Sequence, residues 1–527
     1  MKRKVLFLVA LFLVLVLLPA KDEDIWGYSY KKITSIASLL EEYYYEDVDL
    51  DQLTYSSIRG MLQTLDPHSY FLDPDYLARM TEDYEGKYHG LGILIQKQED
   101  RLVVISPIEG GPAYRLGVLP GDVISHINGE STKNITSREA VQKLRGIKGT
   151  KVNITIVREG LERPLEMTVT REEIPLHSIS YAFILQDDIG YIRIRGFSGT
   201  TTREFEEKMA LLVEQGMKRL ILDLRTNGGG TLVQSIEISD EFLPPGALIV
   251  SMKGRHRDFN REFRAFKADQ YEKTPLVILI DKGSASAPEI VSGAIKDNDR
   301  GLIVGEDSFG KGLVQTVFPV SNNAAVALTT ARYFTPSGRS IQRDYTHIED
   351  YILSKKAPEE KREVRFTTGG RKVLGQGGIS PDYEVKFSLD DIIYYFVYKG
   401  AFFSYARKFV KNETPLSRTF VFPQEKRSKT EKVGGKIVIG RDFRADSEVI
   451  GDFKSFLQEN QIDYDPAEFE SATAEIMRWL EREIFSVLWS QEDGEWAYQR
   501  DDPAVLKAIE VFPEAASLIK QDKPAQE

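Results

Sequence analysis

The 527-residue chain contains no cysteine. This excludes disulfide bonds, a thiol nucleophile, metal sites ligated by cysteine and anchoring through a lipid-modified cysteine. Histidine is scarce: there are six, in no arrangement that we recognise as a catalytic triad, and there is no H-E-x-x-H motif of a zinc peptidase. No metal or organic cofactor is therefore implied. Acidic residues exceed basic ones, 80 against 69, which argues weakly against a nucleic-acid-binding surface.

The N-terminus has the pattern of a secretory signal. A basic segment, residues 2–4, precedes fourteen apolar residues, Val5 to Leu18, and Ala20 marks a candidate cleavage site. As a helix this run would rise about 21 Å, less than the roughly 30 Å of a hydrocarbon core. We predict export to the periplasm or the extracytoplasmic face of a bacterial membrane, with residues 1–20 as a signal peptide or, if uncleaved, a membrane anchor.

A serine, a lysine and a glutamine follow one another in an order that suits peptide hydrolysis. Ser286 lies between an apolar run, Pro275 to Ile280, and a predicted helix from Pro288 to Lys296. A hydroxyl at such a strand-to-helix turn is exposed and lies near the positive end of the helix dipole. Lys311 comes 25 residues after the serine, between two glycines, and Gln315 comes four residues after the lysine.

The lysine is the candidate base. A free lysine has a pKa of about 10.4 and is charged at neutral pH, but burial can lower that pKa by several units. Phe309, Leu313 and Val314 are plausible apolar surroundings. The alternative of a phosphate-binding lysine is not supported, because glycine rather than serine or threonine follows the lysine. Ser284 is a competing hydroxyl.

Several strings, in this order, resemble those of the C-terminal processing proteases, which are serine peptidases with a Ser-Lys catalytic pair and an inserted PDZ domain. The resemblance covers roughly residues 30 to 386. The strings are Leu65-Asp-Pro-His-Ser69, Gly90-Leu-Gly-Ile93, Leu144-Arg-Gly146, Asp223-Leu-Arg-Thr-Asn-Gly-Gly-Gly230, Gly283-Ser-Ala-Ser-Ala287, Gly305-Glu-Asp-Ser-Phe-Gly-Lys-Gly312, Tyr333-Phe-Thr-Pro-Ser-Gly-Arg-Ser-Ile-Gln342 and Gly377-Gly-Ile-Ser-Pro-Asp382.

The resemblance implies roles for the residues of this site. Ser286 would be the nucleophile, Lys311 the general base and Gln315 the residue that orients the lysine amine without adding a charge. The oxyanion of the tetrahedral intermediate would be bound by backbone N–H groups. Ala287 N–H is one candidate; for the other, the resemblance favours Gly229, with Gly230 next.

The expected fold is a multidomain α/β protein. Residues 25–87 form a helical N-terminal region, and the resemblance implies a PDZ domain, rich in β-strands with helices, at 88–172. Strand and helix alternation over 173–386 predicts a largely parallel sheet, and the resemblance makes this protease core crotonase-like. Residues 387–527 form a mainly helical extension.

The predicted PDZ region carries a peptide-binding pattern. Alternating residues predict four strands there, and Ser137 is expected to cap a helix that ends near Leu144. Glycines in Gly90-Leu91-Gly92-Ile93 would turn backbone N–H groups toward a free C-terminal carboxylate, with Leu91 and Ile93 as an apolar wall. The resemblance makes Arg145 a candidate for coupling peptide binding to the catalytic site; otherwise it is an ordinary exposed arginine.

The extension, 387–527, has no assigned role. The segment from Leu389 to Val410 is rich in aromatic residues and predicted helical, residues 424–435 look like a charged loop, and Pro466 can begin another helix. The extension either packs on the core as a helical lobe or offers a surface to an adaptor or to a second copy of the chain.

The sequence departs from the family string after the nucleophile, where Pro288 stands in place of serine. Proline is tolerated in a first helical turn, but it could shift the start of the helix. The sequence therefore predicts an exported serine endopeptidase that binds protein or peptide C-termini. A catalytically idle PDZ scaffold and an acyl-CoA enzyme of the same core fold are the rival hypotheses.

Overall fold

The computed structural model divides into two compact units, Met1–Pro74 with Val317–Leu328 and Asp75–Thr316 with Thr329–Glu527. The predicted signal segment, residues 1–20, lies outside the described residues. These are residues 25–519 without 99, 109, 268–270, 322, 348, 350, 352–359, 361 and 387–389.

The first unit begins with helices, as predicted: α2 (Ile25–Tyr43) and α3 (Leu50–Gln63). Asp49 caps α3, because its side chain accepts hydrogen bonds from two backbone N–H groups of the first turn. The strand β1 (Tyr70–Leu72) then pairs antiparallel with the first residues of β18 (Ala325–Phe334).

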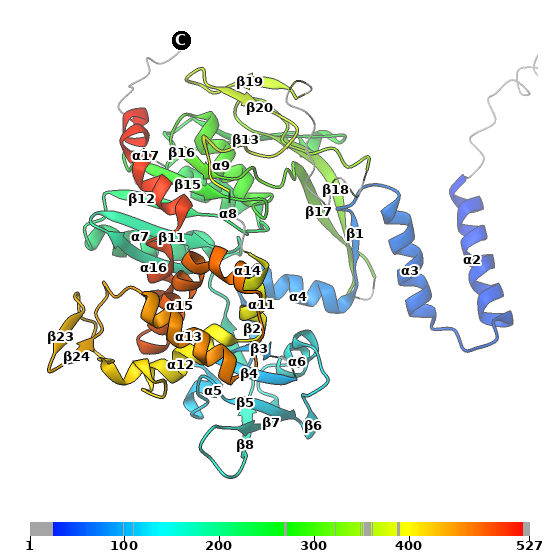
Figure 1. Cartoon of the computed structure of the whole chain (residues 1–527). Helices are drawn as coiled ribbons and strands as arrows, with labels where there is room; N and C mark the ends of the chain where they lie inside the picture. The colour runs from blue at the N-terminus through cyan, green and yellow to red at the C-terminus, as the bar shows by residue number, and fades with distance from the viewer. Residues whose placement is uncertain are drawn as a thin grey trace, which may run out of the picture. The chain divides into compact units, whose positions relative to one another are not determined.

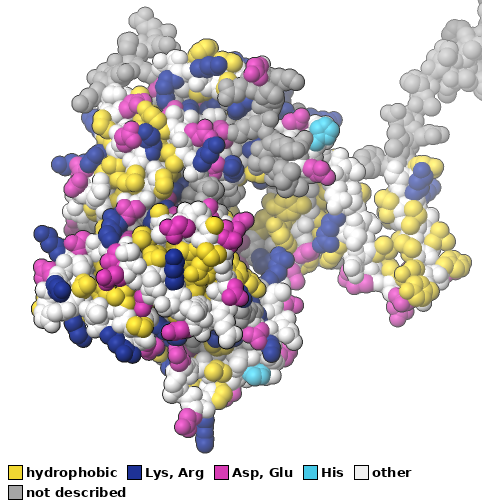
Figure 2. All heavy atoms as spheres, viewed as in Figure 1, with side chains coloured by type: hydrophobic (Ala, Val, Ile, Leu, Met, Phe, Trp, Pro, Cys, Tyr) yellow, Lys and Arg dark blue, Asp and Glu magenta, His cyan; other side chains and the backbone are white. Residues whose placement is uncertain are grey.

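Helix α2 exposes its apolar side chains. Ile33, Ile36 and Leu39 are each about half exposed, and three tyrosines of the same helix are about two-thirds exposed. Figure 2 shows these hydrophobic side chains gathered on the helix.

The region of the predicted PDZ domain is an antiparallel sheet in the order β3-β4-β5-β7-β8, with β6 beside β5. The chain enters and leaves this region through two paired strands, β2 (Lys87–Gly90) and β9 (Glu172–Pro175), after helix α4 (Pro74–Glu85). The bounds are β3 (Ile93–Gln98), β4 (Arg101–Pro107), α5 (Pro112–Arg115), β5 (Val123–Ile127), β6 (Glu130–Ser131), α6 (Ser137–Leu144), β7 (Lys151–Val157) and β8 (Leu165–Thr170).

The predicted cap of α6 is wrong by one residue. Thr136, not Ser137, is the N-cap: its hydroxyl accepts from Glu139 N, and the Glu139 carboxylate accepts from Thr136 N. This reciprocal pair is a capping box, which needs Ser or Thr three residues before Glu.

The core is a six-stranded sheet in which the predicted parallel arrangement is confirmed (Figure 1). Only the first two strands are antiparallel to each other; each later strand lies parallel to its neighbour. In spatial order the strands are β10 (Ile179–Gln186), β11 (Ile189–Ile194), β12 (Arg219–Asp223), β15 (Leu276–Ile280), β16 (Leu302–Gly305) and β21 (Tyr383–Glu384).

Helices cover both faces of this sheet, and β15 shows why its sequence is continuously apolar. Its even-numbered side chains pack against α7 (Thr201–Glu214), α8 (Leu232–Asp240) and α9 (Ala287–Asp297). Its odd-numbered side chains pack against α17 (Pro503–Ile519), close to the C-terminus. A strand buried on both faces needs apolar residues at every position.

A second sheet places β13 (Leu248–Gly254) between β14 (Arg261–Arg264) and the end of β18, which also pairs with β17 (Leu313–Pro319). A 3₁₀ turn, η1 (Arg257–Phe259), joins β13 to β14. A separate hairpin consists of β19 (Val364–Phe366) and β20 (Lys372–Leu374).

The C-terminal region is mainly helical, as predicted, with an aromatic core of its own around Phe396, Phe402 and Phe453. Its elements before α17 are α11 (Asp391–Tyr398), α12 (Ala401–Val410), η3 (Leu416–Thr419), β22 (Phe420–Val421), β23 (Glu431–Val433), β24 (Lys436–Val438), α13 (Ser447–Glu459), α14 (Pro466–Ser471), α15 (Thr473–Leu488) and α16 (Gln491–Gln499).

Two expectations for this region are wrong in detail. The helical segment predicted over 389–410 is two helices, because Gly400 adopts a left-handed conformation (φ +64°) between them. The predicted charged loop over 424–435 contains β23, which pairs with β24 across the turn at Gly434 and Gly435.

Candidate active site

Two loops meet at the carboxyl ends of the neighbouring parallel strands β12 and β15. We call the first, Leu224–Gly230, the glycine loop; the second leads to Ser286. Backbone bonds join them, because Ala285 N donates to Asn227 O (3.0 Å). The Ser284 hydroxyl also donates to Leu224 O (2.8 Å). The carboxyl ends of parallel strands are where α/β folds place their ligand sites.

Ser286 occupies the turn between β15 and α9 in an unusual backbone conformation. Its φ is +62° and its ψ −107°, a region that non-glycine residues rarely adopt and that is often found at functional sites. The residue is half-buried and is the N-cap of α9. Pro288 lies in the first turn of the helix, where its missing N–H needs no partner.

Glu289 connects the serine to the lysine. Its Oε2 accepts hydrogen bonds from Ser286 N (2.8 Å) and Lys311 N (2.9 Å). Its Oε1 accepts from the Ser308 hydroxyl (2.5 Å) and from Gly310 N (2.7 Å). Burial raises the pKa of the Glu289 carboxyl, and the four donors oppose that rise. One buried carboxylate thus fixes the backbones of both residues within two hydrogen-bond lengths of each other.

Gln315 lies in β17, and Lys311 lies two residues before that strand begins. The chain already pairs with β18 at Gly312, whose carbonyl accepts from Tyr333 N (3.0 Å). The Gln315 amide donates to the Thr329 hydroxyl of β18 (3.3 Å). Because side chains alternate along an extended chain, residues four apart are expected on the same side of it.

The glycine loop presents the predicted oxyanion donors. Gly229 N–H donates to Asn227 Oδ1 (2.9 Å), so the donor that the resemblance favours is engaged by a neighbouring side chain. The N–H groups of Gly230 and Ala287 donate to no group within the described part of the chain. These two N–H groups could donate to an anionic oxygen without breaking an existing hydrogen bond, whereas Gly229 N–H would have to give up its bond to Asn227.

Only glycine fits at position 229. A Cβ there would lie 2.9 Å from Ser286 Cβ and 2.9 Å from Ala285 O, and the φ of +108° disfavours any side chain. The approach at the next residue is closer still: a Cβ at Gly230 would lie 2.0 Å from Phe197 O. Phe197 N donates to Gly229 O (2.9 Å), and Phe197 forms an isolated parallel β-bridge with Gly230.

The predicted peptide-binding string leads into β3, which is the outermost strand of its sheet. Helix α6 lies beside this strand. The N–H groups of Leu91 and Gly92 donate to no group among the described residues. The Leu91 side chain itself is only 3% exposed and packs in the domain core, and Ile93 is partly buried beside it. The edge and the N–H groups are the features that strand addition requires.

Arg145 follows α6 directly and contacts two earlier elements. Its guanidinium lies 4.1 Å from the centre of the Tyr88 ring in β2 and 3.4 Å from the Glu82 carboxylate in α4. Burial raises the pKa of Tyr88, and the Arg145 charge opposes that rise. Arg145 is therefore held in place rather than freely exposed.

Sequence analysis missed two residues of this site, Glu289 and Asn227. The first had a signal: Ser286-x-x-Glu289 before an apolar run is the pattern of a capping box. Asn227 bonds to Ile194 O (2.9 Å) through its amide nitrogen and to Gly229 N through its oxygen. Its place in a glycine-rich string gave no hint of these partners.

The fold joins a largely parallel α/β core to a smaller domain built on an antiparallel sheet. Three family models match the chain: peptidase family S41 over residues 188–351, the PDZ domain over 81–157 and the N-terminal domain of the activating protease CtpB over 19–76.

Curated relatives agree. The carboxy-terminal-processing protease of Bartonella bacilliformis is 36% identical over 386 residues, which cover 71% of this chain and 88% of that protein. The carboxyl-terminal-processing protease of Synechocystis is 36% identical over 313 residues, 58% of this chain and 72% of that protein. Among solved structures, the photosystem II D1 C-terminal processing protease is 29% identical, with a TM-score of 0.36, over 66% of this chain and 86% of that one. The chain belongs to the carboxy-terminal-processing proteases of peptidase family S41, which are serine proteases.

Replacing Glu289 by glutamine tests the connection between serine and lysine. The amide offers one acceptor oxygen and two N–H donors to a site that holds four donors, so at least one donor is left unpaired. We expect the free energy of unfolding to fall by about 1–3 kcal/mol in urea titrations. We also expect casein hydrolysis to fall about a hundredfold, because the backbones of both Ser286 and Lys311 shift.

The matched control is Glu207→Gln on α7, whose side chain is 67% exposed. It should change neither quantity. Full activity in Glu289→Gln would show that this carboxylate does not position the two residues.

Proposed function

We propose that this protein is an endopeptidase for the C-terminal processing or degradation of extracytoplasmic proteins, with Ser286 as nucleophile and Lys311 as general base. One observation carries the proposal: the backbones of these two residues share the Oε2 atom of Glu289, beside a glycine that leaves room for the serine. Two residues 25 positions apart are thereby brought to one point at the end of the parallel sheet.

In this mechanism Ser286 Oγ attacks the carbonyl carbon of the scissile peptide bond. The neutral amine of Lys311 takes the hydroxyl proton and then gives it to the leaving amine. The amide of Gln315 orients the lysine amine. Negative charge on the tetrahedral oxygen is stabilised by Ala287 N–H together with Gly229 or Gly230 N–H.

Ser284 is a poorer nucleophile candidate than Ser286. Its side chain is fully buried. Its hydroxyl donates to Leu224 O and lies 3.2 Å from Asp281 Oδ1, so it serves to join the two loops. Attack by Ser284 would require these bonds to break, whereas Ser286 is half-exposed.

The substrate C-terminus would bind as an added strand at the open edge of β3. Its carboxylate would accept from the N–H groups of Leu91 and Gly92, and its last side chain would lie near Ile93. Position 90 has little room for a side chain, because a Cβ there would lie 2.7 Å from the Tyr88 ring and 3.6 Å from Arg145 Cγ.

Arg145 is the proposed link between this groove and the catalytic loops. A series of contacts supports it: Arg145 pairs with Glu82 in α4, and two residues later Tyr84 O accepts from Gly199 N (2.6 Å). The adjacent Phe197 pairs with the glycine loop. A shift of Arg145 on peptide binding could therefore move the oxyanion donors through packed backbone.

Location and partners follow the same proposal. Export depends on residues 1–20; among the residues described, every helix is too short or too polar to cross a bilayer. A second copy of the chain or an adaptor protein would bind the N- or C-terminal helical regions, and the apolar side chains exposed on α2 are one such surface.

The idle-scaffold hypothesis rests on Pro288, and the geometry argues against it. Pro288 occupies the first turn of α9 without displacing its neighbours, since Glu289 keeps all four of its donors. The Ser292 hydroxyl also donates to the backbone carbonyl of Pro288 (2.7 Å). The proline does not disrupt the serine turn.

The proposed catalytic pair is tested by casein hydrolysis with the wild type, Ser286→Ala and Lys311→Ala. We expect cleavage by the wild type and a loss of at least about 10³-fold in each variant, since the members of such a pair act as a unit. Activity that survives in Ser286→Ala would refute the nucleophile assignment. Lack of activity in the wild type would favour the scaffold or a resting form.

The Arg145 link is tested by adding a peptide that ends in a free apolar carboxylate. We expect such a peptide to stimulate casein hydrolysis by the wild type and not by Arg145→Ala, while the peptide still binds both proteins in calorimetry. Arg138→Ala, on the same helix α6, is the control and should keep the stimulation. Equal stimulation of wild type and Arg145→Ala would exclude the coupling role.

A further inference from the structure

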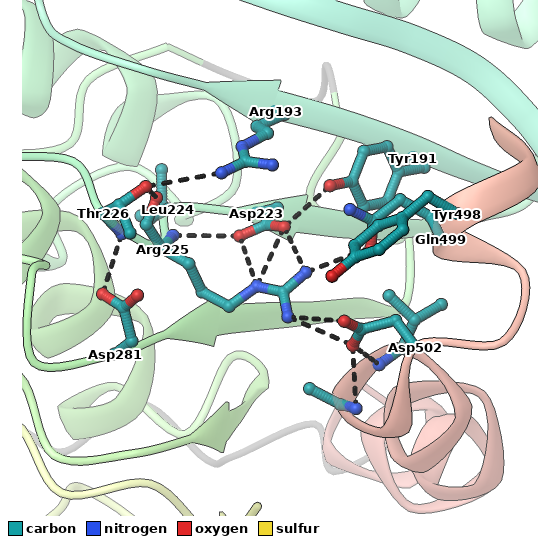
Figure 3. Close-up of polar contacts among 12 residues, drawn as sticks. Tyr191, Arg193, Asp223, Leu224, Arg225, Thr226, Asp281, Tyr498, Gln499 and Asp502 are labelled. Atoms are coloured by element: carbon teal, nitrogen blue, oxygen red, sulfur yellow. Dashed lines mark hydrogen bonds and ion pairs between the residues drawn. The ribbon is translucent and has the colours of Figure 1, made fainter. Parts of the chain in front are cut away.

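The glycine loop is tied to the C-terminal helices through a buried arginine (Figure 3). Arg225 is 6% exposed and lies between two carboxylates. Its Nε and Nη2 donate to Asp223, at 3.0 and 2.7 Å, and its Nη1 donates to both oxygens of Asp502 at 3.1 Å. Nη2 also donates to the amide oxygen of Gln499 (3.1 Å).

Asp502 lies in the turn between α16 and α17, and Gln499 is the last residue of α16. They are 277 and 274 residues away from Arg225 in the sequence. Asp502 Oδ1 also accepts from Ala504 N and Val505 N, which caps the start of α17. Because α17 packs on the core sheet, the carboxylate is held by a fixed element.

Because Arg225 is held in place, the backbone of the residues that follow it is restricted as well. Asp223 Oδ1 accepts from Arg225 N (2.9 Å), and Thr226 N donates to Asp281 Oδ1 (2.8 Å). Thr226 has a positive φ of +57°, which a threonine adopts only under constraint. The oxyanion donors come three and four residues later in the same loop.

A second contact joins α16 to this position. Arg193 of β11 donates to Glu495 Oε1 (3.1 Å) and to the Thr226 hydroxyl (3.4 Å). Side chains of the C-terminal region thus hold two successive residues of the glycine loop. They hold Arg225 directly and Thr226 through Arg193.

Asp502 is one of the carboxylates that offset the arginine charges of this network. Burial by itself would raise the pKa of Asp223, but Arg225 and Arg193 overcome this effect and leave that pKa below its usual value. Arg478, on α15, adds a second cation beside Asp502 (3.2 Å). Removal of one partner from a buried ion pair leaves an uncompensated charge, which is strongly unfavourable.

We propose that Asp502, with Gln499, is a positioning residue for catalysis: it holds Arg225 and, through it, the oxyanion donors of the glycine loop. The C-terminal helices would then be part of the catalytic unit rather than an appended module. The claim about turnover rests on the proposed function, whereas the claim about the loop does not.

The test uses the full chain with Asp502→Asn. Asparagine caps a helix about as well as aspartate, so this change keeps the cap of α17 and removes the charge that faces Arg225. Asp465→Asn is the matched control, because Asp465 caps α14 in the same way and faces solvent. Gln499→Leu is a milder second variant for the case that Asp502→Asn does not fold.

The first measurement is amide hydrogen exchange of the segment 224–230, in a Ser286→Ala background that prevents self-cleavage. We expect exchange of this segment to be about tenfold faster in Asp502→Asn and to rise less in Gln499→Leu, because a loop that loses local stability opens more often. Exchange within α17 should stay unchanged in both. Unchanged exchange at 224–230 in the folded variants would overturn the proposal.

The second measurement is kcat and KM for casein. We expect kcat to fall about tenfold in Asp502→Asn with KM within twofold, and Asp502→Glu to recover most of it, because misplaced oxyanion donors affect the transition state. A rise in KM alone would overturn the positioning role. If the wild type itself is inactive, the proposed function fails, and the exchange measurement still decides the claim about the loop.

Discussion

The close approach of Gly229 to Ser286 is the constraint on which the site depends. The two loops at the ends of β12 and β15 contact each other so closely that no side chain fits between them at position 229. Beside this contact Ser286 has a positive φ. Its backbone N–H donates to Glu289, and the residue lies at the start of α9. The strain that this conformation stores is offset by a fully satisfied buried carboxylate and by the packing of α9 on the sheet.

The glycine loop is held from two directions. Phe197 pairs with its end, and this segment also contacts α4, the helix that pairs with Arg145 beside the peptide-binding region. Arg225, near its start, is held by the C-terminal helices. Two distant parts of the chain therefore contact the same loop.

The sequence predicts what is local. The continuous apolar run of β15 is typical of a buried strand, and Pro288 is typical of a first helical turn. Both elements were predicted. The left-handed glycine at 400 and the capping box at Thr136 also carry local signals. The pairing of Arg225 with Asp502 carries none, because it depends on how α17 covers the sheet. Ion pairs between distant segments, and the burial of Leu91, follow only from tertiary packing.

The most direct test of this account is the rate at which a fluorophosphonate, which modifies activated serines, labels Ser286 in the wild type, Gly229→Ala and Gly216→Ala. The two glycines have similar φ values, +108° and +94°, but a Cβ at Gly216 meets nothing within 4 Å. The account predicts labelling at Ser286, equal rates in the wild type and Gly216→Ala, and a rate at least about tenfold lower in Gly229→Ala. Equal labelling in all three proteins, or labelling at Ser284, would contradict it.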